Sequence, residues 1–181
     1  MKYFIGIVPP PKTLERILTF QKSFPTNKVW FYNEPHITLK APSGLTEDRG
    51  WLARVMVIIG NHEPFEIDFT HLDSFNDEVL FLSPAPSEGL MELHMKLVKE
   101  LCPDETMHKE FFEGEEYHPH LTLGDTSWGG MRKLELVDMR KKAEIEFYNL
   151  PSFLVTFVRV YHKEKQDDPY TKLIDIPLKF I

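Results

Sequence analysis

A five-residue pattern occurs twice in this chain and limits its possible folds more than any other feature. Pro-His-Ile-Thr-Leu occupies residues 35–39, and Pro-His-Leu-Thr-Leu occupies residues 119–123. If each copy is a strand, successive side chains point to opposite faces of the sheet. The His and Thr of each copy then share one face, and the aliphatic residues lie behind them. The pattern therefore predicts two equivalent strands, each presenting an imidazole and a hydroxyl to one cleft.

The segments that flank the two copies repeat in the same order. Each half reads as a buried strand ended by prolines, a helix, the motif strand, a second helix and a strand containing Glu-Ile-acid-Phe. These segments are residues 2–8, 12–23, 35–41, 46–61 and 65–69 in the first half, and 79–82, 88–101, 118–124, 128–142 and 143–147 in the second. The order predicts a divergent internal duplication, with repeats at roughly 2–75 and 77–150.

Two further segments complete the predicted architecture. Residues 28–32 are strand-like, and residues 152–181 read as a C-terminal hairpin with a polar turn over 163–169. A chain of 181 residues can bury a proper core within one domain. We therefore predict a single two-lobed domain over residues 1–181, of the α+β class, built from two pseudo-symmetric β-α-β-α-β lobes.

Charge and cysteine content narrow the class of partner. The formal net charge is −7, whereas proteins that grip long nucleic acids carry a basic surface. We expect no long duplex partner, while a small phosphorylated ligand or an RNA end remains compatible with this charge. No apolar run approaches the ~20 residues that span a bilayer, so no membrane partner is expected. Cys102 is the one cysteine, which rules out an internal disulfide and favours the reducing cytoplasm.

Two histidines that face one cleft suit the cleavage of a phosphodiester. One neutral imidazole, of His36 or His120, takes a proton from the attacking water, and the other, protonated, gives one to the leaving oxygen. The hydroxyls of Thr38 and Thr122 can donate hydrogen bonds to the phosphate oxygens. Lys40 extends the same face by two residues. It is either a phosphate contact or a solvated strand end.

The two tetrads His36-Ile37-Thr38-Leu39 and His120-Leu121-Thr122-Leu123, on this duplicated frame, resemble those of the 2H phosphoesterase superfamily. This superfamily includes the bacterial 2′–5′ RNA ligase/cyclic phosphodiesterase proteins. The strand at residues 1–8, the Pro-His-Ile-Thr-Leu context and the length are most similar to its small phosphoesterase-like proteins of Bacillus-type bacteria. The resemblance covers essentially the whole chain. It implies a two-lobed fold with largely antiparallel sheets around a central cleft. Because the two motif copies occupy equivalent positions in the duplicated lobes, we expect His36 and His120 to be opposed walls of this cleft.

The resemblance also implies an activity and residue roles. The activity is metal-independent and cofactor-free hydrolysis or transfer at 2′,3′-cyclic or 2′–5′ phosphodiesters, in small nucleotides or at RNA ends. His36 and His120 would be catalytic, and Thr38 and Thr122 would bind substrate. The residue pattern leaves open which histidine is the acid; the resemblance implies His120 as the base and His36 as the acid. Hydrolysis of a 2′,3′-cyclic phosphate would then leave a 2′-phosphate.

Two other functions remain open from the sequence. The cleft can bind a phosphorylated nucleotide or RNA end without turning it over, because binding pockets also use imidazole and hydroxyl donors. Alternatively, His118 and His120 can hold a metal ion, although no third ligand has a typical spacing. The metal-free interpretation is preferred.

The remaining aromatic and histidine residues have simpler interpretations. His94 falls on the apolar stripe of its helix and is expected in the core. Tyr117, Phe31 and Trp30 are expected to pack in the core rather than to stack on a base. Residues 111–117, with the sequence Phe-Phe-Glu-Gly-Glu-Glu-Tyr, are expected to form a solvated loop that can gate the cleft.

Overall fold

The computed structural model describes residues 1–102 and 104–179 of the chain. Within them, seven strands form one sheet in the order β4-β5-β6-β2-β1-β8-β9, and β3 pairs separately with β7. The strands are Lys2–Ile7 (β1), Ile37–Lys40 (β2), Phe65–Ile67 (β3), Phe69–Phe75 (β4), Val79–Pro84 (β5), Leu121–Asp125 (β6), Phe153–Val155 (β7), Phe157–Lys163 (β8) and Thr171–Pro177 (β9). Each recorded strand pair is antiparallel. The predicted α+β class with largely antiparallel sheets is confirmed.

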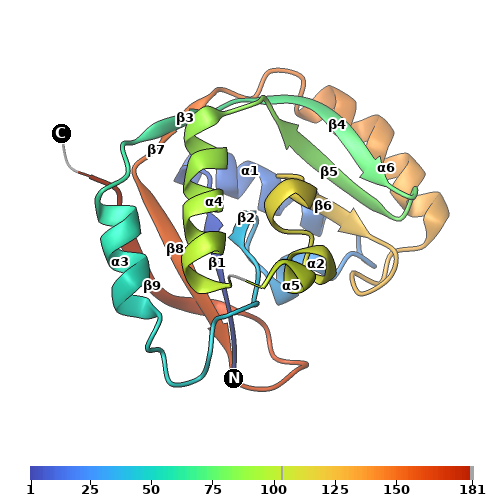
Figure 1. Ribbon diagram of the computed structural model, residues 1–181. Helices are drawn as coiled ribbons and strands as arrows, with labels where there is room; N and C mark the ends of the chain where they lie inside the picture. Colours follow the sequence, from blue (N-terminus) through green and yellow to red (C-terminus); the bar gives the residue numbers. More distant parts are fainter. Residues whose placement is uncertain (103, 180–181) are drawn as a thin grey trace.

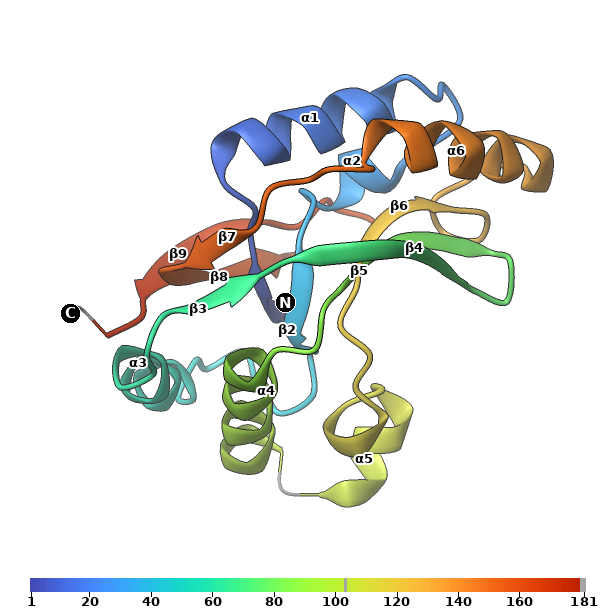
Figure 2. The same cartoon turned by 90° about the horizontal axis from the view of Figure 1, so that it is seen from above.

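Helices cover both faces of the large sheet. They are Pro11–Lys22 (α1), Val29–Tyr32 (α2), Leu52–Gly60 (α3), Glu88–Leu101 (α4), Glu105–Glu110 (α5) and Lys133–Glu146 (α6), with a short 3₁₀ turn at Gly114–Glu116 (η1). Figure 2 shows α1, α2 and α6 on one side of the strands, and α3, α4 and α5 on the other. The two motif strands, β2 and β6, are neighbours at the centre of the sheet (Figure 1).

The order of elements is the same in the two halves of the chain. The first half runs β1-α1-α2-β2-α3-β3-β4, and the second runs β5-α4-α5-β6-α6-β7-β8, with the short turn η1 as an addition between α5 and β6. This order supports the proposed duplication. It also pairs β4 with β8 as counterparts, so a second repeat would extend to Lys163 and leave only β9 outside it.

Two of the predicted strands are wrong. Residues 29–32 form the single-turn helix α2, although Val, Trp, Phe and Tyr favour strands. Residues 143–146 are the last turn of α6, and the strand that follows this helix is β7. Ile145 is 81% exposed, so its alternation with two glutamates does not mark a buried strand face. The Glu-Ile-acid-Phe similarity therefore does not connect equivalent strands. The predicted C-terminal hairpin is present as the pair β8–β9.

The motif strands bury their aliphatic side chains as the alternation predicts. Ile37 and Leu39 of β2, and Leu121 and Leu123 of β6, are all 0% exposed within one large core. Burial of each such side chain stabilises the fold by about 1.5–3 kcal/mol. Because the period of a strand is two, this burial holds the intervening His and Thr side chains on the opposite face.

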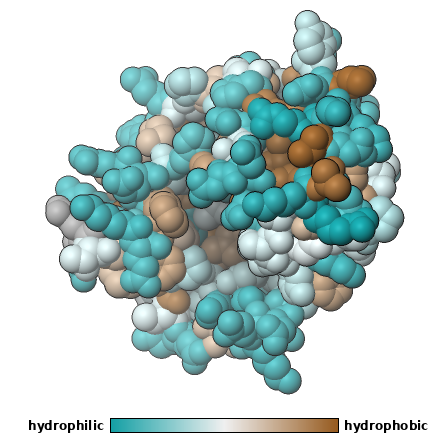
Figure 3. Space-filling model, turned by 90° about the vertical axis from the view of Figure 1, so that its right-hand side faces the viewer, coloured by the Kyte–Doolittle hydropathy of each residue, from teal (hydrophilic) through white to brown (hydrophobic). Residues whose placement is uncertain are grey.

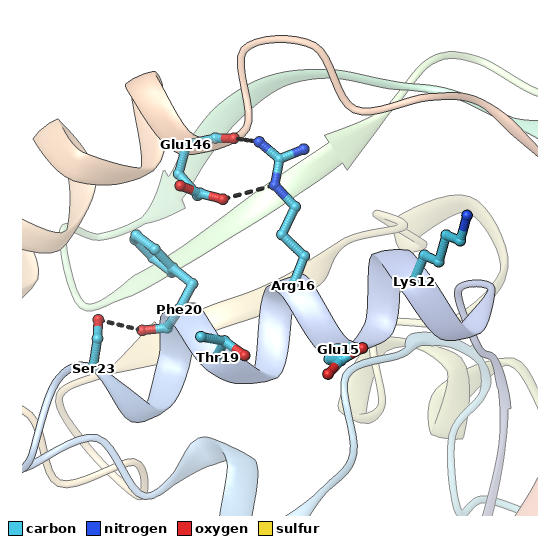
Figure 4. A pocket seen from close by; sticks show the side chains of 7 residues that line it. All are labelled: Lys12, Glu15, Arg16, Thr19, Phe20, Ser23 and Glu146. Atoms are coloured by element: carbon cyan, nitrogen blue, oxygen red, sulfur yellow. Dashed lines mark hydrogen bonds and ion pairs between the residues drawn. The ribbon is translucent and has the colours of Figure 1, made fainter.

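Helices α1 and α6, which are far apart in the sequence, are joined by an ion pair. Arg16 Nε lies 2.7 Å from Glu146 Oε1, and the same guanidinium donates to the Glu146 backbone carbonyl (Figure 4). Lys12, Glu15, Thr19, Phe20 and Ser23 line the pocket beside this pair. None of the motif residues lines that pocket, so it is a feature of the helical layer.

Candidate active site

The pairing of β2 with β6 brings the four motif side chains together. The strands are antiparallel, and Ile37 is the partner of Leu121. Continued by one residue in each direction, this register sets His36 opposite Thr122 and Thr38 opposite His120. Directly opposed residues on neighbouring strands have Cβ atoms about 4.5–5.5 Å apart. The histidines therefore rise from adjacent strands on the floor of the cleft, and the expectation of opposed walls is wrong.

The imidazole of His36 is held at both ring nitrogens. Nδ1 lies 2.6 Å from the backbone carbonyl oxygen of Glu34, and Nε2 lies 3.2 Å from Thr38 Oγ1. A carbonyl oxygen only accepts, so Nδ1 carries the proton in the neutral ring. Nε2 is then the basic nitrogen, and it accepts from the Thr38 hydroxyl. The ring also packs on Phe4, with centroids 4.6 Å apart.

His120 is held in an equivalent way. Its Nδ1 lies 2.8 Å from the carbonyl oxygen of His118, which precedes it by two residues as Glu34 precedes His36. The ring packs against Phe81 at 5.1 Å and edge-on against Phe75 at 5.0 Å. Phe81 lies on β5, the counterpart of the strand that carries Phe4. Both histidines thus present Nε2 away from the backbone, with an aromatic ring behind each imidazole.

Burial makes both imidazoles poor proton acceptors. It lowers the pKa of His36 from 6.5 to about 4, against the raising effect of the hydrogen bond to the Glu34 carbonyl; the nearby His120 lowers it further. Burial is also the main cause that lowers the pKa of His120, and the charge of His118 adds to it. The effect of His120 on the pKa of His36 reflects the short distance between the two imidazoles. In the free protein at neutral pH both rings are therefore mainly neutral.

A polar network supports the segment that holds His36. The carboxylate oxygen Oε1 of Glu34 accepts from Arg159 Nη1 and from the Tyr161 hydroxyl, each at 2.6 Å. Arg159 also makes a two-pronged contact with Asp175, at 2.6 and 2.8 Å. These partners raise the pKa of Arg159 and lower that of Asp175. The network fixes the residue whose carbonyl oxygen orients His36.

Two adjoining cavities open beside the motif residues. The smaller, of about 330 Å³, is lined by His36, Thr38, His120 and Thr122 together. The larger, of about 530 Å³, shares Thr38 and His120 with it. Figure 3 shows a hollow near the centre of the face drawn on the right of Figure 1. One concave site therefore contains all four side chains that the motifs supply.

Lys40 does not lie where the sequence places it. Its ammonium group is fully buried and ion-paired with Glu113, 2.8 Å from Oε1 and 2.9 Å from Oε2. It also donates to the carbonyl oxygen of Ser43 at 2.6 Å. Neither cavity is lined by Lys40. Its role as a phosphate contact is therefore corrected to that of a structural cation, whose partner lies in the acidic loop 111–117.

The other predicted residues are partly where expected. His94 is in the core as predicted, with Nδ1 2.8 Å from the Leu39 carbonyl oxygen and its ring stacked on Tyr117 at 3.6 Å. Tyr117 also lines the larger cavity, and its hydroxyl donates to the carbonyl oxygen of Thr38 at 2.7 Å. Phe31 is 51% exposed and so is not a core residue. Trp30, half-buried, lies 5.0 Å below the Lys22 ammonium group.

The loop 111–117 is only partly solvated. Glu113 is 1% exposed, whereas Phe112 is 72% exposed and has a positive φ of 53°. Phe111, Phe112 and Tyr117 all line the larger cavity, so the loop does form a border of the cleft.

The donor set at His118 and His120 lacks a third metal ligand. Within residues 1–102 and 104–179, no group of three or more His, Cys, Asp or Glu side chains is arranged to hold a metal ion. His118 is exposed and instead meets the edges of Phe75 and Phe81, at 5.3 and 5.7 Å. His118 is therefore part of the aromatic lining of the larger cavity.

Sequence reasoning missed the residues that support the site. The backbone carbonyls of Glu34 and His118, each two positions before a motif histidine, hold the imidazoles, and no side-chain pattern common to these two residues reveals this contact. Arg159 and Tyr161 lie more than 120 positions from Glu34, and no local pattern connects them to it.

Comparison with known proteins identifies the family. The model of the 2′–5′ RNA ligase superfamily matches residues 10–164. The chain therefore belongs to this superfamily, the 2H phosphoesterases, as the paired motifs indicated. A Bacillus licheniformis protein named Putative phosphoesterase is 25% identical over 127 residues, which cover 68% of this chain and 70% of that protein. Family membership indicates phosphodiester processing as the class of chemistry.

Solved structures share the fold. E. coli LigT complexed with 3′-AMP superposes with a TM-score of 0.61 at 17% identity, over 99% of this chain and 98% of LigT. A protein of Thermus thermophilus gives 0.65 at 18% identity, with the same coverage. At these identities the likeness concerns the fold alone. No helix in the described part of the chain is long and apolar enough to cross a membrane.

Proposed function

We propose that the chain is a metal-independent phosphodiesterase that cleaves 2′,3′-cyclic or 2′–5′ phosphodiester bonds in small nucleotides or at RNA ends. His36 and His120 are its general base and acid, and Thr38 and Thr122 bind the phosphate. One observation carries this proposal: the register of β2 and β6 gathers these four side chains at a single cavity. The proposed reaction requires no metal ion and no organic cofactor. The cytoplasm is its proposed location.

The proposed reaction is an in-line displacement at phosphorus. His36 Nε2 takes a proton from water while the water oxygen attacks the phosphorus atom. The bond from phosphorus to the ribose oxygen on the far side breaks, and His120 Nε2 gives its proton to that oxygen. With a 2′,3′-cyclic phosphate the products are a phosphomonoester, the 2′-phosphate, and a free 3′-hydroxyl. The hydroxyls of Thr38 and Thr122 donate to the non-bridging oxygens, where negative charge builds up.

The proposed roles of the two histidines reverse those that the family resemblance implied. The base must be neutral before the reaction, and the pKa of His36 is lowered to about 4. Its Nδ1 proton is directed at the Glu34 carbonyl, so Nε2 carries the lone pair. In the free protein this lone pair accepts from the Thr38 hydroxyl, and in the proposed reaction that hydroxyl turns to the phosphate and leaves Nε2 to the attacking water. Among the described contacts, His120 Nε2 has no hydroxyl partner. This nitrogen is therefore open to hold the proton that the leaving oxygen receives, and the lowered pKa of His120 favours its release.

The test is turnover of 2′,3′-cyclic nucleotides and 2′–5′ dinucleotides, measured with and without EDTA and with identification of the product phosphate. The proposal expects hydrolysis that survives chelation and leaves a 2′-phosphate. Activity that chelation removes, and that added metal restores, would favour a metal site instead. Measurable affinity for these ligands without turnover would make the chain a binding protein that uses the same cleft.

A further inference from the structure

The walls of the cleft offer no side-chain cation to a ligand. Among the residues that the structure describes, no Lys or Arg lines either of the two adjoining cavities. Lys40 and Arg159 contact wall residues from behind, and both are already engaged. Lys40 is paired with Glu113, and Arg159 with Glu34 and Asp175. Positive charge in the cleft can therefore come only from an imidazolium.

The charge that the walls do offer is negative. Glu34 lines the smaller cavity, while Glu113 and Glu116 line the larger one. The first two carboxylates are compensated by Arg159 and Lys40. Glu116 is exposed, and no cation lies within ion-pair distance of it in the described part of the chain. A second phosphate group in the larger cavity would therefore add negative charge beside this carboxylate, with no Lys or Arg among the lining residues to balance it.

The larger cavity suits an uncharged, flat group. Its volume of about 530 Å³ is within the range of small-ligand sites. Its lining includes six residues with apolar or aromatic side chains: Leu39, Ala41, Phe75, Phe111, Phe112 and Tyr117. Aromatic rings bind planar groups by stacking or edge contacts, and stacking does not depend on charge. Because this cavity shares Thr38 and His120 with the smaller one, a group held there lies next to the proposed position of the reacting phosphate.

We propose that the cleft discriminates against phosphodiester substrates that carry an additional terminal phosphate, and that it holds a nucleobase-sized group of the substrate in the larger cavity. This inference rests on the proposed function. A phosphodiester carries one negative charge, which one imidazolium balances. A terminal phosphomonoester adds about −1.5 to −2 near pH 7, and the walls hold nothing to balance it.

The experiment compares adenosine 2′,3′-cyclic phosphate with the same compound carrying a 5′-phosphate. We expect kcat/KM to be about tenfold or more lower for the phosphorylated substrate, since the added phosphate meets like charge and no counter-charge in the cavity walls. Glu116→Lys should narrow this ratio by about threefold or more, because it places a cation in the cavity wall. The matched control is Glu115→Lys, an equal change of charge at the adjacent exposed position, which lines neither cavity. It should leave the ratio unchanged.

Equal kcat/KM for the two substrates, or equal effects of the two lysine variants, would overturn the inference. The dissociation constants of both compounds for His120→Ala, measured by calorimetry, separate it from the proposed function. A tenfold preference in binding without any turnover by the wild type would support the selectivity and overturn the phosphodiesterase. Turnover of both compounds with equal kcat/KM would support the phosphodiesterase and overturn the selectivity. If neither compound binds or reacts, both proposals fail.

Discussion

The buried pair of Lys40 and Glu113 attaches the loop that carries Phe112 to the first motif strand. Both side chains are at most 1% exposed, and the Glu113 carboxylate also accepts from the backbone N–H of Ala41, at 2.8 Å, and from the Ser43 hydroxyl. Replacing Glu113 by alanine leaves an ammonium group in the core without a counter-charge. It also leaves the N–H group of Ala41 without this acceptor.

Glu113→Ala should destabilise the fold by about 3–5 kcal/mol, the usual cost of removing one partner of a buried ion pair. In a chain of this length each kcal/mol corresponds to about 2–4 °C in Tm, so Tm should fall by roughly 10 °C. Lys40 keeps the carbonyl oxygens of Ala41 and Ser43 as acceptors, which favours the lower end of the range. Lys40→Met combined with Glu113→Leu should recover most of the loss, because neither charge is then buried.

Stability to urea provides the measurement, with exposed Glu116→Ala as the control that should change the free energy of unfolding by no more than about 0.5 kcal/mol. Burial already lowers the pKa of Lys40, and Glu113 raises it; without Glu113 the pKa falls further. The unfolded chain then binds the proton more tightly, so the Glu113→Ala protein should gain stability as the pH rises. A loss below about 1 kcal/mol, or a double variant no more stable than Glu113→Ala, would refute this reasoning.

Three further outcomes follow from the geometry of the site. Burial holds the pKa of His36 at about 4 and that of His120 below 6.5. A plot of kcat/KM against pH should therefore be bell-shaped, with its maximum below pH 6.5. A maximum in alkaline solution would contradict the assignment of the acid and the base. The depressed pKa of His36 also means that the unfolded chain is protonated first as the pH falls. Urea titrations should therefore show about 2 kcal/mol less stability at roughly pH 5 than at roughly pH 8 from this residue, and His36→Asn should lack that difference. Tyr161→Phe removes a donor to Glu34 and should cost about 1 kcal/mol of stability. It should lower kcat by less than about tenfold, and a fall of about a hundredfold would mean that the hydroxyl acts in the reaction itself.

The parts of the fold that the sequence predicted are those with a long, consistent pattern. Helices over 12–23 and 88–101 were expected, and α1 and α4 occupy nearly the same residues. The motif strands were recognisable because alternation over four or five residues separates a buried face from a polar one. Residues 143–147 alternate equally well, yet they end a helix, since five residues cannot outweigh the helical turns that precede them.

The site was predictable as a set of residues but not as a geometry. Equivalent positions in two repeats identified His36, Thr38, His120 and Thr122. The sequence did not reveal that β2 and β6 pair directly, because strand pairing depends on contacts between residues far apart in the chain. For the same reason the sequence did not reveal the ion pair of Lys40, whose partner Glu113 lies 73 positions away. Alternation along the strand predicted on which face Lys40 lies. It could not predict that the Lys40 side chain is buried in an ion pair with the Glu113 carboxylate.

The most direct test of the account is the rate at which His36→Ala and His120→Ala hydrolyse one 2′,3′-cyclic nucleotide. His71→Ala serves as the control, because His71 is exposed and lines neither cavity. With folding verified by circular dichroism, each motif variant should lose about 10²–10⁴-fold in kcat, as expected for a general acid or base. The His71→Ala protein should keep the wild-type rate. Wild-type turnover in either motif variant would contradict the proposed acid–base pair.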